Sequence, residues 1–474
     1  MNTANHTAPD LAALDGDTLW WLLRETADGR RDGLAGQLAQ LCVNAGASRL
    51  GWVSPPQWKL VERAISAVLA VLHLSTVRPI LALSTGGWSF AARAISELFP
   101  QARPPLDSLD PARIRRALAS ADEPVQAMLA VSASRSTLET HLLTQVIAGL
   151  TKPRRPQLAW LSDAAGPSNV LPLSPRGALD QVAMLGAPLS TAFLIAAEAA
   201  GAGIAPAYAS LLSRYDQIGL SAVRLAALAP ASGSPFIRFV TPPWTGHGLR
   251  LWLLQLGRQV LCGKSSSFTP RIELGDPAQL QAPSEVRLDV SGLPRSLSAL
   301  MELLYVSGVF VAALALRAGL PVASHAYVGA YKDRLTLARK YARDLHQVRT
   351  VELPDVAASW LTDRPELTRL HVVRYDPGRE AGSAAFTRAT GRLCEVHVGS
   401  AWNHHSFHAV YADPGTATLV AVAPPDTAAA VPVPLQTAAR AQREIGIATW
   451  MALAERAMIV QLSPEAGGEG AHYE

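Results

Sequence analysis

Short apolar runs, polar turns and helix-like stretches follow one another along most of the chain. Continuous apolar runs of about five residues are typical of strands that are buried on both faces. Such strands are expected at 79–83, 125–131 and 157–161, and the helices that follow them at 90–98, 138–150 and 179–212. This repeat of strand, polar turn and helix predicts a doubly wound parallel sheet.

The same pattern returns after residue 230, and strand-like runs continue to the C-terminal part. Further strands are expected at 236–240, 286–290, 371–375, 394–398, 407–411 and 418–422, and further helices at 11–24, 58–73, 246–256, 298–318 and 435–455. We therefore expect an α/β protein with two doubly wound lobes, at 76–230 and 231–350. A helical layer at 1–75 precedes them, and a mixed region at 351–474 that ends in a helix follows.

Composition and charge narrow the class of protein. Of 474 residues, 49% are hydrophobic and 17% are charged, so the chain can bury a large core and is not disordered. The formal net charge of +4 is small for this length and the basic residues are scattered, which argues against nucleic acid as a partner. The three cysteines, Cys42, Cys262 and Cys394, have no metal-binding or disulfide spacing, which fits a reducing compartment.

A membrane span is not expected. The first residues are polar and acidic and lack the basic and apolar regions of a leader. The most lipid-like stretch, 184–204, carries Glu198 and has Pro188 near its start, so a buried helix explains it better than a span. We expect a cytoplasmic protein with no membrane partner.

The polar turn at 132–140 is the most informative stretch. It places five hydroxyls in nine residues, Ser132, Ser134, Ser136, Thr137 and Thr140, between an expected strand and an expected helix. Hydroxyls and free N–H groups at a helix N-terminus suit an anion such as a sugar phosphate. Neither GxxxxGK[ST] nor GxGxxG occurs there, which disfavours a P-loop and a dinucleotide site. The plainer alternative is that one hydroxyl only caps the helix.

A second polar turn lies one strand earlier. Gly86 and Gly87 follow the strand at 79–83, and Trp88 comes next. Paired glycines allow a ligand to approach the backbone closely. Because neighbouring parallel strands end at the same edge of a sheet, we expect the two turns to share one crevice.

The two turns resemble the sugar isomerase (SIS) fold of phosphoglucose isomerase, in which the matching segments read GIGGS and SKSGTTTET. Four later segments resemble that family in the same order. Leu179–Ala187 is similar to the helix after its GGR motif, and Gln255–Lys264 is similar to its ES(N/T)GK segment. Leu320–Asp333 is similar to its segment INPFDQPNVQEAKD. Thr437–Leu453 is similar to the terminal helix of the isomerase domain that is fused to transaldolase in some bacteria. The resemblance covers about residues 75–460 and rests mainly on the order of these motifs.

The resemblance implies aldose–ketose interconversion of a sugar phosphate through an enediol. That chemistry needs a phosphate cradle, a base and a nearby cation. The implied substrate-binding residues are Gly86, Gly87, Trp88, Ser132, Ser134, Arg135, Ser136, Thr137, Thr140 and Lys264. The family's cradle lysine and glycine are Ala133 and Arg135 here, so Arg135 either contacts a phosphate or fills the pocket. The active-site lysine of the family falls on Lys332, in a loop that also holds His325; a solvated lysine is the alternative.

The same comparison implies that the base has been lost. The family glutamate falls on Val260, and the arginine that supports the enediolate falls on Ala178. Valine cannot accept a proton, and a general base contributes roughly 10²- to 10⁴-fold to such a reaction. We therefore expect no efficient glucose 6-phosphate isomerase activity.

Four histidines, His397, His404, His405 and His408, lie within twelve residues. This stretch lies where the fused isomerase domains carry their catalytic histidine, so His404 or His405 is the candidate replacement base. Closely spaced imidazoles also suit a zinc-like ion. A polar loop, or histidines bonded to backbone carbonyls, is the plainer alternative. In an alternating strand His397 would point away from His404 and His408. No metal ligand set and no cofactor are assigned from the sequence.

Three functions therefore remain open. The first is a phosphoglucose isomerase-like enzyme that acts on a sugar phosphate or a related small anion. The second is a non-catalytic phosphosugar-binding or regulatory protein. The third is an enzyme of specialised metabolism that runs a different reaction in the same crevice, and Trp88 and Trp244 at expected ligand turns favour a substrate with an aromatic or apolar part. A homodimer fits each of the three.

Overall fold

A computed structural model describes most of the chain as helices and parallel strands. The described residues are 11–30, 32–33, 35–36, 43–44, 47–48, 50–75, 80–100, 102–119, 125–132, 135, 137–152, 155–173, 190–261, 268, 270–275, 285–320, 327, 329–340, 345–376, 382–425 and 431–463. Their strands form three all-parallel sheets and one short antiparallel pair. This confirms the expected α/β class.

The chain separates into two compact units, each made of several segments. The first unit comprises Met1–Asp107, Glu123–His141 and Arg155–Ala326, and the second comprises Ser108–Asp122, Leu142–Arg154 and Tyr327–Glu474. Two of the parallel sheets belong to the first unit and one belongs to the second. The domain limits expected after residues 75, 230 and 350 stay predictions.

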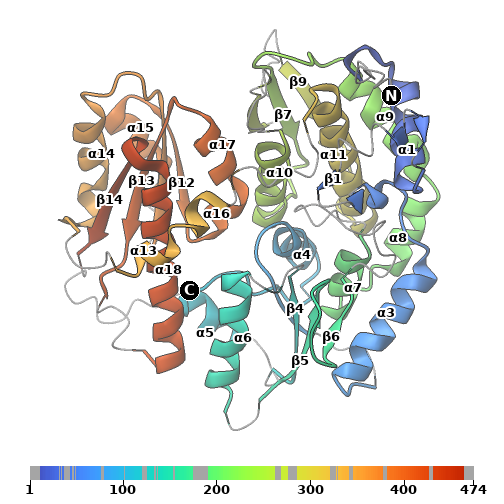
Figure 1. The fold of residues 1–474 in the computed structure, drawn as a ribbon, viewed down its shortest axis with the longest axis horizontal. Coiled ribbons are helices and arrows are strands. Elements are labelled where there is room, and N and C mark those ends of the chain that lie inside the picture. Colours follow the sequence, from blue (N-terminus) through green and yellow to red (C-terminus); the bar gives the residue numbers. More distant parts are fainter. Residues whose placement is uncertain are drawn as a thin grey trace, which may run out of the picture. The chain divides into compact units, whose positions relative to one another are not determined.

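The first sheet of the first unit has the strand order β3-β4-β5-β6. Its strands are β3 (Leu81–Leu83), β4 (Ala127–Val131), β5 (Gln157–Leu161) and β6 (Val170–Leu171). Every residue of β3 and β4 is buried, which is why these strands read as unbroken apolar runs. Helix α7 (Thr191–Ala199) packs on β4 and contacts α3 (Trp58–Val71) and α4 (Gly87–Leu98), as Figure 1 shows.

The second sheet of the first unit has the order β8-β7-β9. Its strands are β7 (Phe236–Val240), β8 (Arg271–Gly275) and β9 (Glu285–Asp289), and its neighbouring helices are α8 (Ala205–Leu212), α9 (Tyr215–Ala227), α10 (His247–Val260) and α11 (Leu297–Arg317). Among the described helices, α11 has the length and hydropathy of a membrane span, yet 89% of its apolar window is buried inside the protein. It is therefore placed as a core helix, packed against α8, α9 and α10.

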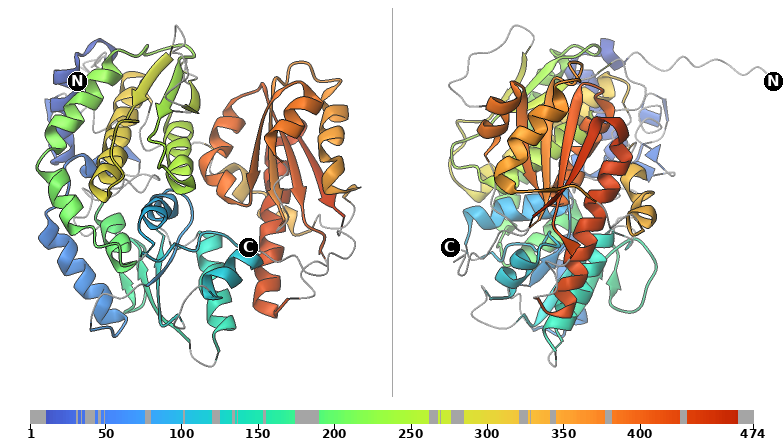
Figure 2. Two further views of the ribbon diagram at one scale, coloured as in Figure 1. Left: turned by 180° about the vertical axis from the view of Figure 1, so that it is seen from behind. Right: turned by 90° about the vertical axis from the view of Figure 1, so that its left-hand side faces the viewer.

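The N-terminal segment forms a helical layer, as expected. Helix α1 (Gly16–Ala27) begins where Asp15 accepts a hydrogen bond from Thr18 N (2.8 Å). It packs on α9 (Figure 2), where a Cβ on Gly219 would lie 2.1 Å from the Trp20 ring. The layer also contains the antiparallel pair β1 (Val43–Asn44) and β2 (Ala47–Ser48).

The sheet of the second unit has the order β10-β14-β13-β11-β12. Its strands are β10 (Gln347–Val348), β11 (Arg369–Tyr375), β12 (Leu393–Val398), β13 (Thr416–Val422) and β14 (Ala457–Leu462). The helices of this unit include α5 (Pro111–Ala119), α12 (Gly329–Lys332), α13 (Leu335–Ala338), α14 (Leu353–Leu361), α15 (Ser383–Thr390), α16 (Ala401–His405), α17 (Phe407–Ala412) and α18 (Val433–Leu453). Counted from β11, the order 2-1-3-4 is that of a flavodoxin-like doubly wound sheet. β12 is therefore an edge strand.

One expected strand of this region is wrong. Residues 407–411 lie in helix α17, and not in a strand. Phe407 and Tyr411 are four residues apart, and their ring centroids lie 5.6 Å apart on one face of the helix. Phe407, His408 and Val410 are buried. An apolar pattern this short fits both the 3.6-residue period of a helix and the two-residue period of a strand. The sequence alone could therefore not distinguish a helix from a strand here.

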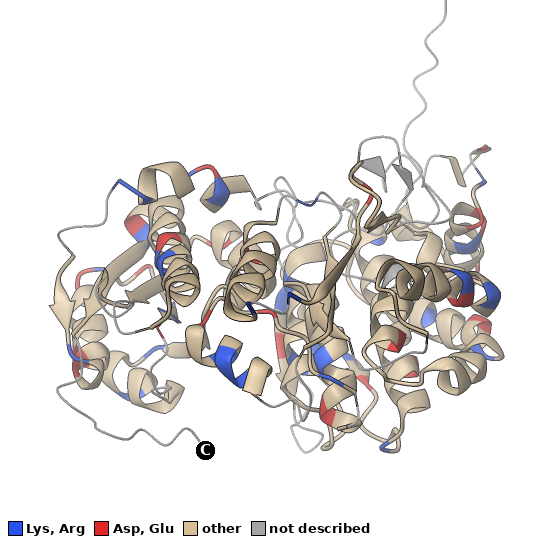
Figure 3. Ribbon diagram, turned by 90° about the horizontal axis from the view of Figure 1, so that it is seen from below, with Lys and Arg blue, Asp and Glu red and all other residues tan. Residues whose placement is uncertain are grey.

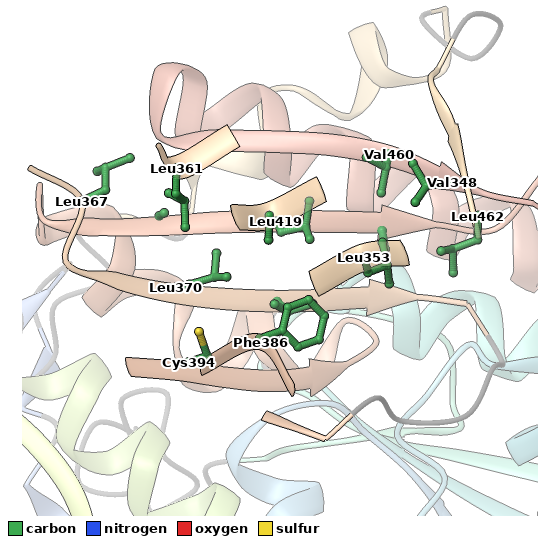
Figure 4. Packing of buried hydrophobic residues seen from close by; sticks show 14 residues of the cluster. Val348, Leu353, Leu361, Leu367, Leu370, Phe386, Cys394, Leu419, Val460 and Leu462 are labelled. Atoms are coloured by element: carbon green, nitrogen blue, oxygen red, sulfur yellow. The ribbon is translucent and has the colours of Figure 1, made fainter. Parts of the chain in front are cut away.

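The core of the second unit lies on one face of its sheet. α14 and α15 cover that face, where Leu353, Leu361 and Phe386 pack on Leu370 and Leu419 (Figure 4). α13 and α18 contribute a second cluster, in which Ala338, Ile447 and Ala448 pack with Ile459 of β14. Both faces of the sheet are thus covered, as in other parallel sheets.

Positively and negatively charged residues are interspersed along the described ribbon, as Figure 3 shows. Many of them form ion pairs, such as Arg24–Asp216 (2.8 Å) and Arg339–Glu444 (3.1 Å). Pairs of this exposed kind contribute little to stability. The fold therefore depends mainly on apolar burial.

Leu370→Ala is expected to destabilise the second unit, and Leu393→Ala is the matched control. Leu370 is fully buried on β11, whereas Leu393 on the neighbouring strand β12 is 49% exposed. Removing a buried leucine costs about 2–5 kcal/mol, and an exposed substitution changes stability by about 0.5 kcal/mol or less. Urea unfolding followed by circular dichroism measures both. Equal losses in the two variants would contradict the core described for this sheet.

Candidate functional site

The two predicted ligand turns lie at one edge of the first sheet. β3 and β4 are parallel neighbours, and Leu83 pairs with Ala130 near their carboxyl ends. The turn at 84–86 therefore begins beside the turn that starts at Ser132. In doubly wound sheets this edge is where ligands bind.

Gly86 shapes the first turn. It is the N-cap of α4 and has φ 78° and ψ −144°, a conformation that residues with a Cβ rarely adopt. Its carbonyl accepts a hydrogen bond from Ser89 Oγ (2.7 Å), which closes the first turn of the helix. Gly86 and Gly87 are buried, and Trp88 is half-buried. The helix thus starts directly at the edge of the sheet.

The hydroxyls of the two turns divide into satisfied and unsatisfied groups. Ser132 Oγ and Thr137 Oγ1 lie 3.0 Å apart and share a hydrogen bond. Ser84 Oγ, Thr85 Oγ1 and Thr140 Oγ1 are buried and make no hydrogen bond. Ser134 and Ser136 lie outside the described residues. Unpaired buried hydroxyls are uncommon and call for an explanation such as a missing ligand or water.

The guanidinium of Arg135 contacts other residues of the protein. It has φ 55°, its Nη1 donates to the Ala165 carbonyl (3.1 Å), and its guanidinium lies 5.6 Å from the centre of the Trp160 ring. These contacts fix the side chain against β5 and the loop after it. A contact between Arg135 and a phosphate therefore stays a prediction.

The position at which the family resemblance places a base lies at the end of α10. Val260 is the last residue of α10 and is 3% exposed. Gln259, beside it, accepts a hydrogen bond from Gln255 Nε2 (2.7 Å), and α10 carries no carboxylate. Ala178 and Lys264 lie outside the described residues.

Glu97 fixes the helix that Gly86 begins. Its carboxylate accepts hydrogen bonds from Gly248 N (3.1 and 3.0 Å), which joins α4 to the N-terminus of α10. Burial raises the pKa of Glu97, and the bonds from Gly248 partly oppose that shift. Arg93, one turn earlier, pairs with Asp107. α4 is thus tied at its far end by charged groups.

Three of the candidate catalytic residues, Lys332, His404 and His405, belong to the second unit, whereas the two turns and His325 belong to the first. Lys332 is the exposed last residue of the short helix α12. His404 and His405 lie on α16, where His405 is 2% exposed and its Nδ1 lies 2.7 Å from Ser406 Oγ. His325 lies outside the described residues.

The four-histidine segment is not one strand. His397 is on β12, as expected, but His404 and His405 are on α16 and His408 is on α17. The rings of His397 and His405 lie 5.0 Å apart, and the ring of His408 packs against Tyr327 at 6.1 Å. The sequence missed the other neighbours of His397, which are His371 and Glu395.

Trp244 has a structural partner. Its Nε1 donates to the Leu293 carbonyl (2.8 Å) within the first unit. This bond fixes the indole beside the turn after β9. The idea that Trp244 meets a substrate therefore stays a prediction.

Comparison with known proteins gives likenesses of fold alone. No family model and no curated protein matches the chain. Similar solved structures include a hypothetical protein from Thermus thermophilus, with 18% identity, a TM-score of 0.47, and coverage of 70% of this chain and 97% of that one. A glucose-6-phosphate isomerase from Chlamydia trachomatis has 11% identity, a TM-score of 0.43, and coverage of 69% and 86%.

A third similar structure is the C-terminal domain of glucosamine-fructose-6-phosphate aminotransferase from Francisella tularensis, with 10% identity, a TM-score of 0.32, and coverage of 67% and 100%. All three are likenesses of fold at low sequence identity. With TM-scores of 0.47 or less and identities of 18% or less, they carry no argument about ligand or activity.

Gly86→Ala is expected to lower stability by about 1–3 kcal/mol, because a Cβ is strained at this φ and ψ. Gly292→Ala is the matched control, since a Cβ there would meet open space and its φ lies outside the left-handed range. Thermal unfolding of both variants measures the difference. Two equally stable variants would show that the α4 turn does not need a glycine.

Proposed function

We propose that this chain binds a small phosphorylated sugar, or a related small anion, at the carboxyl ends of β3 and β4, and that it is not an efficient glucose 6-phosphate isomerase. The observation that carries the proposal is the set of buried, unbonded hydroxyls Ser84, Thr85 and Thr140 at that edge. A buried polar group without a partner costs about 1–3 kcal/mol. A ligand oxygen that bonds these hydroxyls would recover this free energy.

The surroundings favour a monoanionic or dianionic group held by neutral donors. α4 and α6 (Leu138–Leu150) both begin at this edge, and helix N-termini offer N–H groups and a favourable dipole. Arg135 is engaged elsewhere, and the one acidic residue in the first turn of α6, Glu139, is buried at 2% exposure. A single phosphate ester fits such a site better than a diphosphate, whose larger charge needs cations.

The ordinary isomerase reaction lacks its base. A proton has to move between two carbons on one group held over both, and Val260 supplies no such group. The proposed ligand is therefore a phosphorylated sugar, as in the resembled family, but the proposed function does not include that family's isomerase reaction. A different reaction on the same ligand and a purely binding role remain distinct outcomes of the turnover assay.

Thr140→Val is expected to weaken ligand binding without destabilising the free protein. Its Oγ1 has no protein partner, so the variant loses a ligand contact and removes an unsatisfied group. Thermal melts with fructose 6-phosphate and with inorganic phosphate measure the stabilisation, about 2.7 kcal/mol at 100 times Kd. Thr151→Val, whose Oγ1 donates to the Ile147 carbonyl (2.8 Å), should keep the ligand-induced shift. No shift with any phosphorylated sugar in the unmodified protein would overturn the proposal.

Turnover of fructose 6-phosphate by the unmodified protein is expected to lie far below the usual enzyme range of about 1–10³ s⁻¹. The physical reason is the valine at position 260 in place of a carboxylate. A coupled assay for glucose 6-phosphate measures the rate. A rate within the usual range would show that another group acts as the base. The thermal melts would still test ligand binding independently of this result.

A further inference from the structure

Three chemistry-bearing side chains of the second unit share one face of its sheet. β11 and β12 are parallel, with His371 opposite Glu395 and Val373 opposite His397. Residues that pair directly across two parallel strands point to the same side of the sheet, and so do residues two apart on one strand. His371, Glu395 and His397 therefore lie together, on the side opposite the core residues Leu370 and Cys394. β12 is the edge strand of the described sheet, and the Glu395 side chain on it is 33% exposed.

Their ligand atoms converge. One nitrogen or oxygen atom from each of the three residues lies within 4.8 Å of the other two. His397 Nε2 is 3.2 Å from Glu395 Oε2, and His371 Nε2 is 3.9 Å from Glu395 Oε1. Two ligands of one zinc ion at bond lengths of about 2.0–2.2 Å are about 3.3 Å apart. The distance from His397 to Glu395 already matches that spacing, and the distance from His371 to Glu395 exceeds it by about 0.6 Å.

Burial and hydrogen bonding leave His397 ready for a ligand. The side chains of His371 and His397 are 8% and 10% exposed, and that of Glu395 is 33% exposed. His397 Nε2 is buried and makes no hydrogen bond of acceptable geometry, even with Glu395. Such a nitrogen, aimed at a carboxylate, is uncommon without a further partner.

We propose that His371, Glu395 and His397 bind one divalent transition-metal ion of the zinc class. Two imidazoles and one carboxylate form a ligand set that suits such ions and leaves further coordination positions open. The neighbouring imidazole of His405 is buried, and its ring lies 5.0 Å from the His397 ring. On the same face Arg369, the nearby cation of β11, lies 3.8 Å from Asp413 and is partly neutralised by it.

Trp402 sets the affinity of this site. Its Nε1–H donates to His371 Nδ1 (3.1 Å), and an indole nitrogen can only donate. The metal-free His371 therefore carries its proton on Nε2, the atom that faces Glu395. An ion bound at Nε2 displaces that proton, moves the tautomer to Nδ1–H and breaks the bond from Trp402. Most metal-binding histidines donate from the second nitrogen, so Trp402 works against occupancy.

Titration of the whole protein with Zn²⁺ and Co²⁺ by calorimetry and by cobalt absorption tests the site. One ion per chain is expected, and Glu395→Gln should lower the affinity at least ten-fold, because a ligand is worth more than the outer-shell groups that contribute 10- to 100-fold. His404→Ala is the matched control from the same histidine segment, and it should bind as the unmodified protein does. No stoichiometric ion, or equal affinity in Glu395→Gln, would overturn the proposal.

Trp402→Phe gives a second, independent readout. It keeps an aromatic ring in the buried position and removes the N–H that holds His371 in the unfavourable tautomer. The variant is expected to bind the ion about five-fold more tightly, the equivalent of one ordinary hydrogen bond. Circular dichroism checks that it folds. Weaker binding by a folded Trp402→Phe would show that His371 does not ligate the ion through Nε2.

Discussion

Burial of parallel strands on both faces is the constraint on which the rest of this structure depends. A parallel ladder needs helices to return the chain, and those helices cover the sheet on both sides. The strands consequently end together, and whatever follows them in the sequence meets at one edge. In the first unit this places a glycine turn beside a hydroxyl-rich turn. In the second unit the same kind of pairing aligns His371 with Glu395 across two strands.

The sequence predicted those elements whose burial pattern was simple. The helix at 138–150 and the strands at 157–161 and 236–240 lie where they were expected, because unbroken apolar runs follow from burial on both faces. β8 was missed because Arg271 and Glu273 interrupt its pattern and face outward as an ion pair. Strand partners cannot be deduced from spacing, so nothing in the sequence joined His371 to Glu395 and His397. That neighbourhood depends on register, which only the folded sheet sets.

The candidate ligand turn and the position expected for a base differ in their chemistry. The turn retains its hydroxyls, its glycine at positive φ and its place at the sheet edge. The position expected for the base holds a buried valine, whose neighbour Gln259 is bonded to Gln255 one helical turn away. Because Val260 is buried in the core, a carboxylate introduced at this position would be a buried charge without a partner. The residues at the candidate turn and the residue at the expected base position are therefore subject to different packing constraints.

Unsatisfied polar groups are where the structure departs from what stability alone would favour. The hydroxyls of Ser84, Thr85 and Thr140 at the edge of the first sheet and the Nε2 atom of His397 in the second unit are among the described polar groups that are buried without a hydrogen bond. Apolar residues of similar size would fill those positions at lower free energy, as Val260 does in α10. Trp402 shows the opposite arrangement, because its N–H is satisfied inside the fold by His371 Nδ1. Local hydrogen bonding thus decides, residue by residue, which buried polar groups stay available to a ligand and which are committed to the fold.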